Sequence, residues 1–143
     1  MNNFALQQHN CFGCGLKNDI GLKLHFTKKN NLIIGTCSTK HEHEGFPNIL
    51  HGGIQTTILD EAMNWAFLID GIFVFTTKIE IKFRAPVDIG QKITIEASVV
   101  ELKNKIYTAT GKIYLASGKL ATESYGEFYL INDEKKSQIL SLI

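Results

Sequence analysis

An unusually apolar stretch in the first half of the chain constrains the fold more than any other feature of the sequence. Its residues follow a helical pattern from Gly53 to Ile69, and Asp70-Gly71 then supplies a normal helix stop. Apolar side chains cover more than half of the helix circumference: Ile54, Ile58, Leu59, Ala62, Met63, Trp65, Ala66 and Ile69. A helix with so wide an apolar surface is buried, so we predict that a sheet encloses it.

Alternating polarity in the flanking segments predicts the strands of that sheet. From Phe73 to Phe83 the odd positions hold apolar residues and Thr77, whereas the even positions are mostly charged, which indicates one buried and one wet face. We predict strands over residues 21–28, 32–39, 73–83, 93–99, 106–115 and 120–130, and a short helix over 133–143. Two strands, one long helix and four consecutive antiparallel strands make an α+β fold, which we expect to form a single domain over residues 1–143.

Composition and charge argue against several classes of function. The formal net charge of +1 gives no support for binding to nucleic acid or to an acidic membrane surface. The stretch 62–75 is interrupted by Asn64 and Asp70 and is too short to cross a bilayer. Residues 1–10 lack the basic and apolar regions of a signal peptide, and an odd number of cysteines suits a reducing compartment. We therefore expect a cytoplasmic protein that does not enter membranes.

Cys11 and Cys14 form a C-x-x-C motif near the N-terminus. A zinc site would have to recruit further ligands, such as Cys37, His9 or His25, because no second cysteine pair follows. We interpret the motif as two reduced thiols in a glycine-rich turn. Neither a metal nor a cofactor is expected.

The residues that begin the long helix carry groups that acyl transfer requires. The sequence His51-Gly52-Gly53 leaves two backbone N–H groups free of side chains where the helix starts, and that end of a helix attracts anions. Asp60 follows two turns later as a possible general base or nucleophile. This combination indicates a site that could stabilise an oxyanion and also attack or deprotonate.

The spacing of Gly53 and Asp60 predicts that such a site is shared between two chains. Seven residues place the two about 20° apart around the helix axis and about 10 Å apart along it. One reacting carbonyl group cannot contact both at about 3 Å. An antiparallel pair of helices about a two-fold axis would bring Gly53 of one chain to Asp60 of the other, so we expect a homodimer.

Three segments of the chain resemble a known family. They are HGGIQTTILDEAM, in which the acid stands nine residues after the histidine, CFGCGLKNDIGL near the N-terminus, and KFRAPVDIGQ at the end of a predicted strand. They are similar to segments of the hotdog-fold acyl-CoA thioesterases of the PaaI-like, or 4-hydroxybenzoyl-CoA thioesterase, superfamily. The resemblance implies one long central helix wrapped by a curved antiparallel β-sheet, with dimers that pair edge to edge and often form homotetramers. It also implies a hydrolase that converts an acyl-CoA to a carboxylic acid and free CoA at the dimer interface.

The resemblance implies roles for individual residues as well. Asp60 matches the catalytic acid, as general base or as nucleophile, and Gly53 matches the residue whose N–H polarises the thioester carbonyl. His51 matches a histidine that lies close to the thioester in relatives, although it could equally be a structural residue of the loop. Thr76 stands where some relatives place a hydroxyl that positions the nucleophilic water. Thr77 is a rival, because it interrupts the apolar positions of its strand.

Further residues are expected to bind the substrate. Gly52 belongs to the helix start, and Asn64 continues the polar stripe of the helix one turn beyond the acid. Lys82 and Arg84 share a strand face with Lys78 and could bind the phosphates of CoA. The alternative is an ordinary charged face in contact with solvent.

The sequence leaves the acyl group and other functions open. Trp65, Phe67 and Met63 could line an aromatic or a fatty acyl tunnel. Some PaaI-like enzymes have an active-site asparagine six residues before the motif histidine, where this chain has Gly45, so another group replaces it or this branch works without it. A non-catalytic hotdog protein that binds an acyl-CoA-like ligand is the main alternative. A hydratase would need an Asp/His pair, and no histidine follows Asp60.

Overall fold

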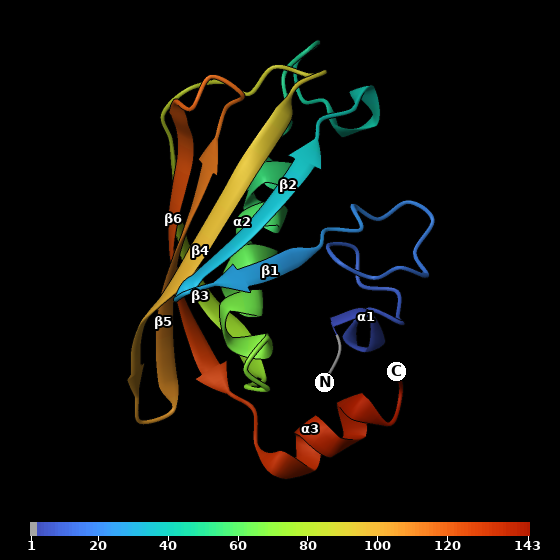
Figure 1. Cartoon of the computed structure of the whole chain (residues 1–143), viewed down its shortest axis with the longest axis vertical. Helices are drawn as coiled ribbons and strands as arrows, with labels where there is room; N and C mark the ends of the chain where they lie inside the picture. Colours follow the sequence, from blue (N-terminus) through green and yellow to red (C-terminus); the bar gives the residue numbers. More distant parts are fainter. Residues whose placement is uncertain (1–2) are drawn as a thin grey trace.

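A curved sheet of six antiparallel strands wraps around one long helix in this computed structural model, which describes residues 3–143 (Figure 1). The order of the strands across the sheet is β1-β2-β4-β5-β6-β3. The elements are α1 (Asn3–Leu6), β1 (Phe26–Lys29), β2 (Leu32–Ser38), the 3-10 helix η1 (His41–His43), α2 (Gly52–Leu68), β3 (Val74–Phe83), β4 (Lys92–Lys103), β5 (Ile106–Tyr114), β6 (Leu120–Leu130) and α3 (Asp133–Leu140). The expected α+β hotdog architecture is confirmed.

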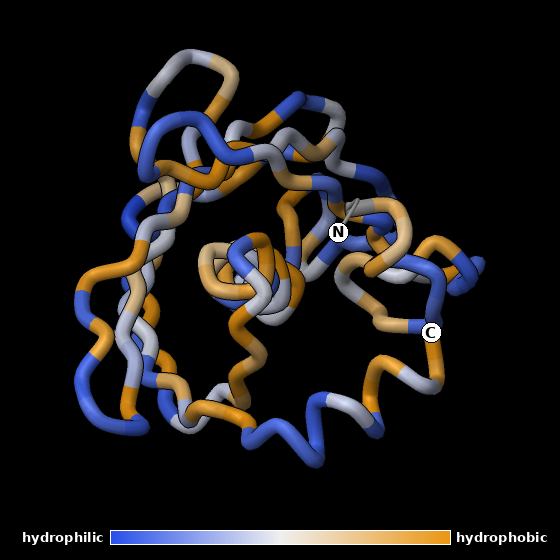
Figure 2. Tube along the Cα trace, turned by 60° about the horizontal axis from the view of Figure 1, so that its bottom comes forward, coloured by the Kyte–Doolittle hydropathy of each residue, from blue (hydrophilic) through white to orange (hydrophobic). Residues whose placement is uncertain are grey.

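Helix α2 forms the centre of the hydrophobic core, as its apolar circumference predicts. Leu59, Ala62, Met63 and Phe67 have no measurable exposure to solvent. They pack against inward-facing side chains of the sheet, and the hydropathy-coloured trace shows the apolar helix inside the curve of the strands (Figure 2). Burial of these side chains contributes hydrophobic stabilisation of about 25 cal/mol per Å² of apolar surface.

The predicted first strand is too long at its N-terminal end. Residues 21–25 do not join the sheet, because their backbone bonds instead to the loop that carries the C-x-x-C motif. The N–H of Leu22 donates to the carbonyl of Phe12 at 2.8 Å, and that of Leu24 to Gly13 at 2.9 Å. These bonds fasten the N-terminal loop beside the sheet and, with it, against α2.

The four later strands do not form a simple meander. β3 pairs with β6, and β4 pairs with β2, so the chain crosses from one side of the sheet to the other after β3. The crossing segment bonds to the loop before α2: the Leu50 N–H donates to the carbonyl of Val87, and the Ile89 N–H to that of Asn48. The crossing therefore supports the start of α2 and leaves β3 at the edge of the sheet.

A β-bulge in β3 overturns the prediction of unbroken alternation. Thr76 pairs with Phe128 and Lys78 with Glu127, which leaves Thr77 without a register partner. An extra residue in one strand switches the faces on which the following side chains lie. Ile79 and Ile81 after the bulge therefore face the helix, as Thr76 does before it. Phe75, at an odd position before the bulge, faces the other way and is 51% exposed.

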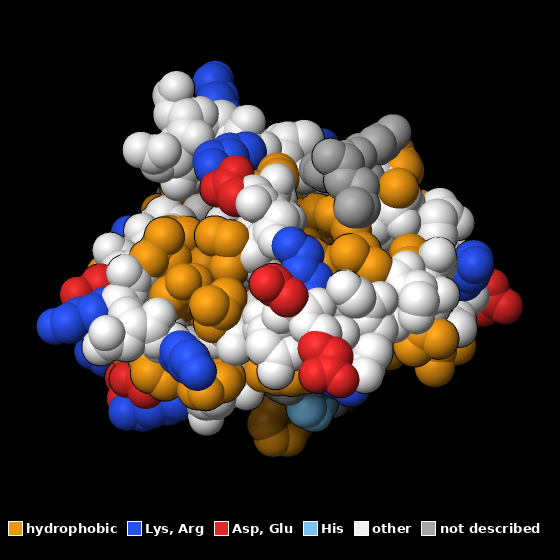
Figure 3. All heavy atoms as spheres, turned by 90° about the horizontal axis from the view of Figure 1, so that it is seen from below, with side chains coloured by type: hydrophobic (Ala, Val, Ile, Leu, Met, Phe, Trp, Pro, Cys, Tyr) orange, Lys and Arg blue, Asp and Glu red, His pale blue; other side chains and the backbone are white. Residues whose placement is uncertain are grey.

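Surface polarity is uneven at the end of the molecule where α3 lies. Figure 3 shows hydrophobic side chains gathered in patches there, between charged ones. Among the described residues, no helix combines the length and the hydropathy needed to cross a membrane.

Candidate functional site

Asp60 and Thr76 meet between α2 and β3. The Thr76 hydroxyl donates a hydrogen bond of 2.7 Å to the Asp60 carboxylate. Asp60 is half-buried, and burial raises the pKa of its carboxyl group, while the bond from Thr76 acts in the opposite direction. Asp60 is therefore a partly desolvated carboxylate with an oriented hydroxyl beside it, not a fully solvated surface acid.

The bulge in β3 separates the two threonines that the sequence leaves as rivals. Thr76 precedes the bulge and faces the helix, whereas the Thr77 hydroxyl donates to the backbone carbonyl of Glu127 on β6 at 3.0 Å. The structure thus brings Thr76 to the carboxylate and uses Thr77 within the sheet. Nothing in the alternation of residues 73–83 could have revealed this, because the bulge is an irregularity of pairing.

The start of α2 is capped by the motif histidine. His51 is the N-cap residue, and its ring nitrogen Nδ1 accepts a hydrogen bond of 2.8 Å from the Gly53 N–H. Because a backbone amide can only donate, Nδ1 carries no proton, and in the neutral ring the proton resides on Nε2. The predicted oxyanion donor is therefore occupied by His51 in the free chain, which sequence reasoning did not foresee.

Close packing surrounds this helix start. A Cβ atom on Gly45 would lie 3.3 Å from the Cα of His51, so the position that holds asparagine in some relatives does adjoin the motif histidine. A Cβ on Gly52 would meet the ring of Phe83 at 3.4 Å. Glycine at both positions therefore permits close packing around the first turn of the helix.

Gly53 and Asp60 lie on one unbroken helix. The helical rise keeps them about 10 Å apart, as the sequence requires. Within one chain the two groups therefore cannot contact the same reacting atom.

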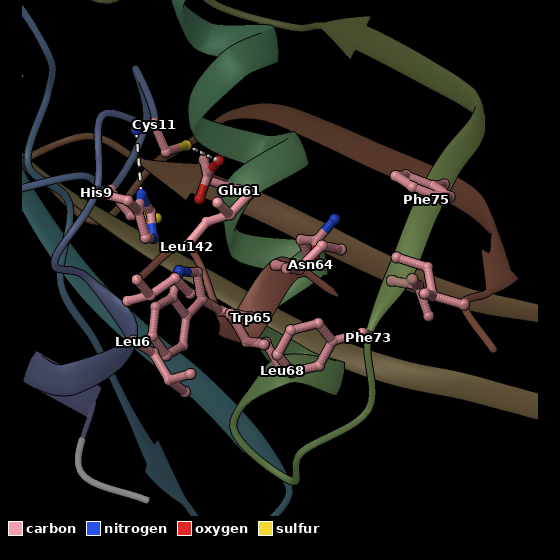
Figure 4. Close-up of a pocket in the computed structure, with 15 residues that line it drawn as sticks. Leu6, His9, Cys11, Glu61, Asn64, Trp65, Leu68, Phe73, Phe75 and Leu142 are labelled. Atoms are coloured by element: carbon pink, nitrogen blue, oxygen red, sulfur yellow. Dashed lines mark hydrogen bonds between the residues drawn. The ribbon is translucent and has the colours of Figure 1, made fainter. Parts of the chain in front are cut away.

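An apolar cavity of about 370 Å³ opens one turn beyond Asp60 (Figure 4). Asn64 lies at its wall, and the hydrophobic lining comes from α2, β3, the N-terminal segment and the C-terminal segment: Leu6, Trp65, Leu68, Phe73, Val74, Phe75, Ile131, Ile139, Leu142 and Ile143. Of the three residues proposed to line an acyl tunnel, only Trp65 does so. Met63 and Phe67 are sealed in the core, because they face the sheet.

Cys11, Cys14 and Glu61 form a cluster at the polar end of this cavity. Their ligand atoms all lie within 4.8 Å of one another, and the Cys11 thiol donates to the Glu61 carboxylate at 3.0 Å. Burial raises the pKa of Glu61 to about 8. The sequence named the two cysteines but missed Glu61, which is adjacent to Asp60 but lies on another face of the helix.

The candidate ligands that the sequence suggested in place of Glu61 lie elsewhere. Cys37 is on β2 and contacts the carbonyl of Ser38, and His25 bonds to the side chain of Gln7. His9 is closer: its Nδ1 accepts a hydrogen bond from the Cys11 N–H at 3.1 Å.

The basic residues of β3 point away from the carboxylate. Ile79 and Ile81 face the helix, so Lys82 alternates to the outer face of the sheet. Arg84 forms an ion pair of 2.8 Å with Glu123, and Lys78 one of 3.2 Å with Glu80. The structure does not bring these side chains to Asp60 within one chain.

Comparisons with known proteins point to one family. The family model described as the thioesterase superfamily matches residues 47–122, more than half of the chain. Acyl-coenzyme A thioesterase THEM4 of Bos taurus is 25% identical over 135 residues, which cover 92% of this chain and 56% of the relative. The chain thus spans about half the length of that curated relative.

Solved structures share the fold. The PaaI protein of the E. coli phenylacetic acid degradation operon has a TM-score of 0.72 at 18% identity, covering 78% of this chain and 81% of that one. A hypothetical thioesterase of Streptococcus pneumoniae with coenzyme A has a TM-score of 0.72 at 14% identity, covering 76% and 89%. Two further structures of the pneumococcal protein carry alanine in place of an aspartate and of a threonine that stand 16 positions apart.

Proposed function

The chain belongs to the thioesterase superfamily, and from this premise we propose that it hydrolyses an acyl-CoA thioester to a carboxylic acid and free CoA. The observation that carries the proposal is the Asp60 carboxylate, half-buried on the central helix and bonded to the Thr76 hydroxyl. The same separation of 16 positions relates the aspartate and the threonine replaced in the pneumococcal structures, which supports treating the two residues as one unit. The coenzyme A in the other pneumococcal structure supports the choice of substrate class.

The proposed oxyanion donor is the Gly53 N–H at the positive end of α2. One such donor contributes roughly 3–4 kcal/mol to the stabilisation of the transition state in other acyl-transfer enzymes. Since His51 Nδ1 accepts from this N–H in the free chain, the thioester carbonyl takes the place of the ring when substrate binds. His51 is exposed, so its ring has room to turn aside, and its Nε2–H can then donate to the substrate.

Asp60 acts in one of two ways, and both balance. As a general base it takes a proton from water while the water oxygen attacks the carbonyl carbon and the CoA thiolate leaves. As a nucleophile its carboxylate attacks the carbonyl carbon and expels the CoA thiolate, which leaves a mixed anhydride that water hydrolyses to the free acid and Asp60. In both cases the Thr76 hydroxyl positions the reacting oxygen.

The acyl group is proposed to enter the cavity beside Asn64. Its walls are mainly apolar away from the end that holds Glu61, and a volume of about 370 Å³ suits an aryl or an aliphatic chain. Gly52, which carries no side chain at the helix start, is proposed to contact the pantetheine arm.

Two chains are proposed to complete each site. β3 is the last strand of the sheet, so the outer edge of its backbone is available to pair with a second copy. Such a homodimer would bring Gly53 of one chain toward Asp60 of its partner, and two dimers would form the expected homotetramer. The cytoplasmic location remains a prediction.

A panel of aryl, short-chain and long-chain acyl-CoA substrates, with detection of the released thiol, tests the activity. We expect Asp60→Asn to lower kcat by at least about 100-fold on the best substrate, because general-base catalysis contributes about that much or more. Asp70→Asn is the matched control: its carboxylate ends the same helix, bonds to Lys28 at 2.6 Å and should leave kcat unchanged. Turnover by the Asp60 variant at the wild-type rate would refute the catalytic role.

A non-catalytic acyl-CoA-binding protein is the second candidate, and one observation favours it. The Gly53 N–H, the proposed oxyanion donor, is already occupied by His51. Saturable binding of acyl-CoA without thiol release would establish this alternative.

A further inference from the structure

The proposed hydrolysis does not use the cluster of Cys11, Cys14 and Glu61. It lies where the N-terminal loop meets α2, at the polar end of the cavity, and Figure 4 shows the Cys11 sulfur and the Glu61 carboxylate pointing toward each other. Two sulfur atoms and a carboxylate oxygen within 4.8 Å are ligand types that a tetrahedral Zn²⁺ site uses.

The glycines of the motif are needed for this approach. A Cβ on Gly13 would lie 2.0 Å from Cγ of Glu61, and one on Gly15 would lie 2.4 Å from the backbone N of Cys11. Any larger residue at position 13 would therefore push the carboxylate away from the thiols. The loop backbone is shaped to admit Glu61 and to turn tightly around Cys11.

One buried hydrogen-bond donor beside the cluster has no partner among residues 3–143. It is the indole N–H of Trp65, which is 1% exposed and lines the same cavity as Cys11 and Cys14. A donor at this position can stabilise a metal-bound thiolate.

Within the described part of the chain, none of the ion pairs involves Glu61. In its ionised form this half-buried carboxylate would need a charged partner, and two thiols cannot supply one. A divalent cation would supply the missing charge and use all three side chains.

We propose that Cys11, Cys14 and Glu61 bind a divalent cation of the zinc class. The thiols lose their protons to solvent as the ion binds. The fourth coordination position faces the cavity, where water can occupy it. The ion would fasten the N-terminal loop to α2 directly after Asp60, and this proposal does not rest on the chain being a thioesterase.

The test is the metal content of the reduced, purified full-length chain after saturation with Zn²⁺ and gel filtration. We expect about one Zn²⁺ per chain in the wild type and a loss of most of it in Cys14→Ser and in Glu61→Gln. Cys37→Ser is the matched control, because Cys37 is a half-buried cysteine on β2 outside the cluster, and it should retain the metal. Removal of Zn²⁺ by a chelator should lower the Tm of the wild type but not of Glu61→Gln.

A second measurement uses only the wild-type chain, so it tests the metal site even if the substituted chains fail to fold. With Zn²⁺ bound, a thiol reagent should rapidly modify only Cys37, the cysteine outside the cluster. With the metal removed, it should modify Cys11 as well. When Co²⁺ replaces Zn²⁺, the spectrum of the protein should show the additional absorption of a thiolate–metal bond. Metal content far below one ion per chain, with equal thiol reactivity in both conditions, would overturn the proposal.

Discussion

The environment of the Asp60 carboxylate is determined by the side chains around it. It stands on a helix that is otherwise buried in the core, so the carboxylate is half-desolvated, and a hydroxyl from β3 is its partner. A charged group on so apolar a helix is costly without a partner. The sequence predicted the acid itself. It could not choose between Thr76 and Thr77, since the choice depends on the bulge.

Removal of the Thr76 hydroxyl should affect catalysis through the position of the reacting oxygen. We expect Thr76→Val to lower kcat by about 10- to 100-fold, which corresponds to the loss of one hydrogen bond to a charged group. Thr77→Val is the control, because it removes a hydroxyl that bonds only to the backbone carbonyl of Glu127. Steady-state kinetics on one acyl-CoA decide between them, and a larger loss in the Thr77 variant would contradict the assignment.

Glu61 is a second residue whose contacts could not be predicted from the order of residues in the sequence. The sequence identifies Cys11 and Cys14 as a pair, but their nearest acidic partner is 47 to 50 positions away on α2. Packing of the N-terminal loop on the helix creates the cluster, and no pattern of spacing encodes that packing.

At the scale of elements, α2 was predictable in length, burial and end point because its signals are local. The stop at Gly71 uses a left-handed backbone conformation, with φ of 77°, which glycine adopts without strain. The capping of its start by a histidine side chain was not predictable, because histidine is an unusual N-cap.

The cap gives a stability prediction. His51→Ala should lower the free energy of unfolding by about 1 kcal/mol, because the Gly53 N–H loses its acceptor at the helix start. His51→Asn should recover most of that loss, since asparagine is a favoured N-cap residue. Urea denaturation measures both, and equal stability of all three proteins would show that the cap contributes nothing.

Lys82 on β3 and Arg84 just after this strand are the residues with which the proposed phosphate site can be tested. Reversal of charge in Lys82→Glu with Arg84→Glu should raise KM for acyl-CoA several-fold and leave KM for a short thioester without phosphates unchanged. A control with the same change in charge is Lys103→Glu with Lys105→Glu, at the tip of the β4–β5 hairpin. Equal effects on both substrates would mean that Lys82 and Arg84 belong to an ordinary solvated face.

At the scale of the whole molecule, the alternating segments predicted an antiparallel sheet around the helix but not the order of its strands. Strands that follow one another in the sequence usually pair, which would give a meander. The structure differs because the chain crosses the sheet after β3. That crossing places β3 at the edge. Phe75 and Tyr129, register partners on β3 and β6, are 51% and 43% exposed, which supports a further interface on this side.

Mixed dimers test whether one site uses Gly53 of one chain and Asp60 of another. Gly53→Pro removes the N–H in the first turn, where the fixed φ of proline is tolerated, and its ring must displace the His51 side chain, which a Cβ would approach to 3.0 Å. Asp60→Asn removes the acid. Circular dichroism and gel filtration serve as controls for folding and assembly.

Each variant alone should be nearly inactive. After co-expression, a mixed dimer would contain one site with both groups intact, so the random mixture should show about a quarter of the wild-type thioester hydrolysis. Dimers isolated with one chain of each kind should show about half. Mixed dimers that assemble normally but are no more active than the two parents would contradict the shared site.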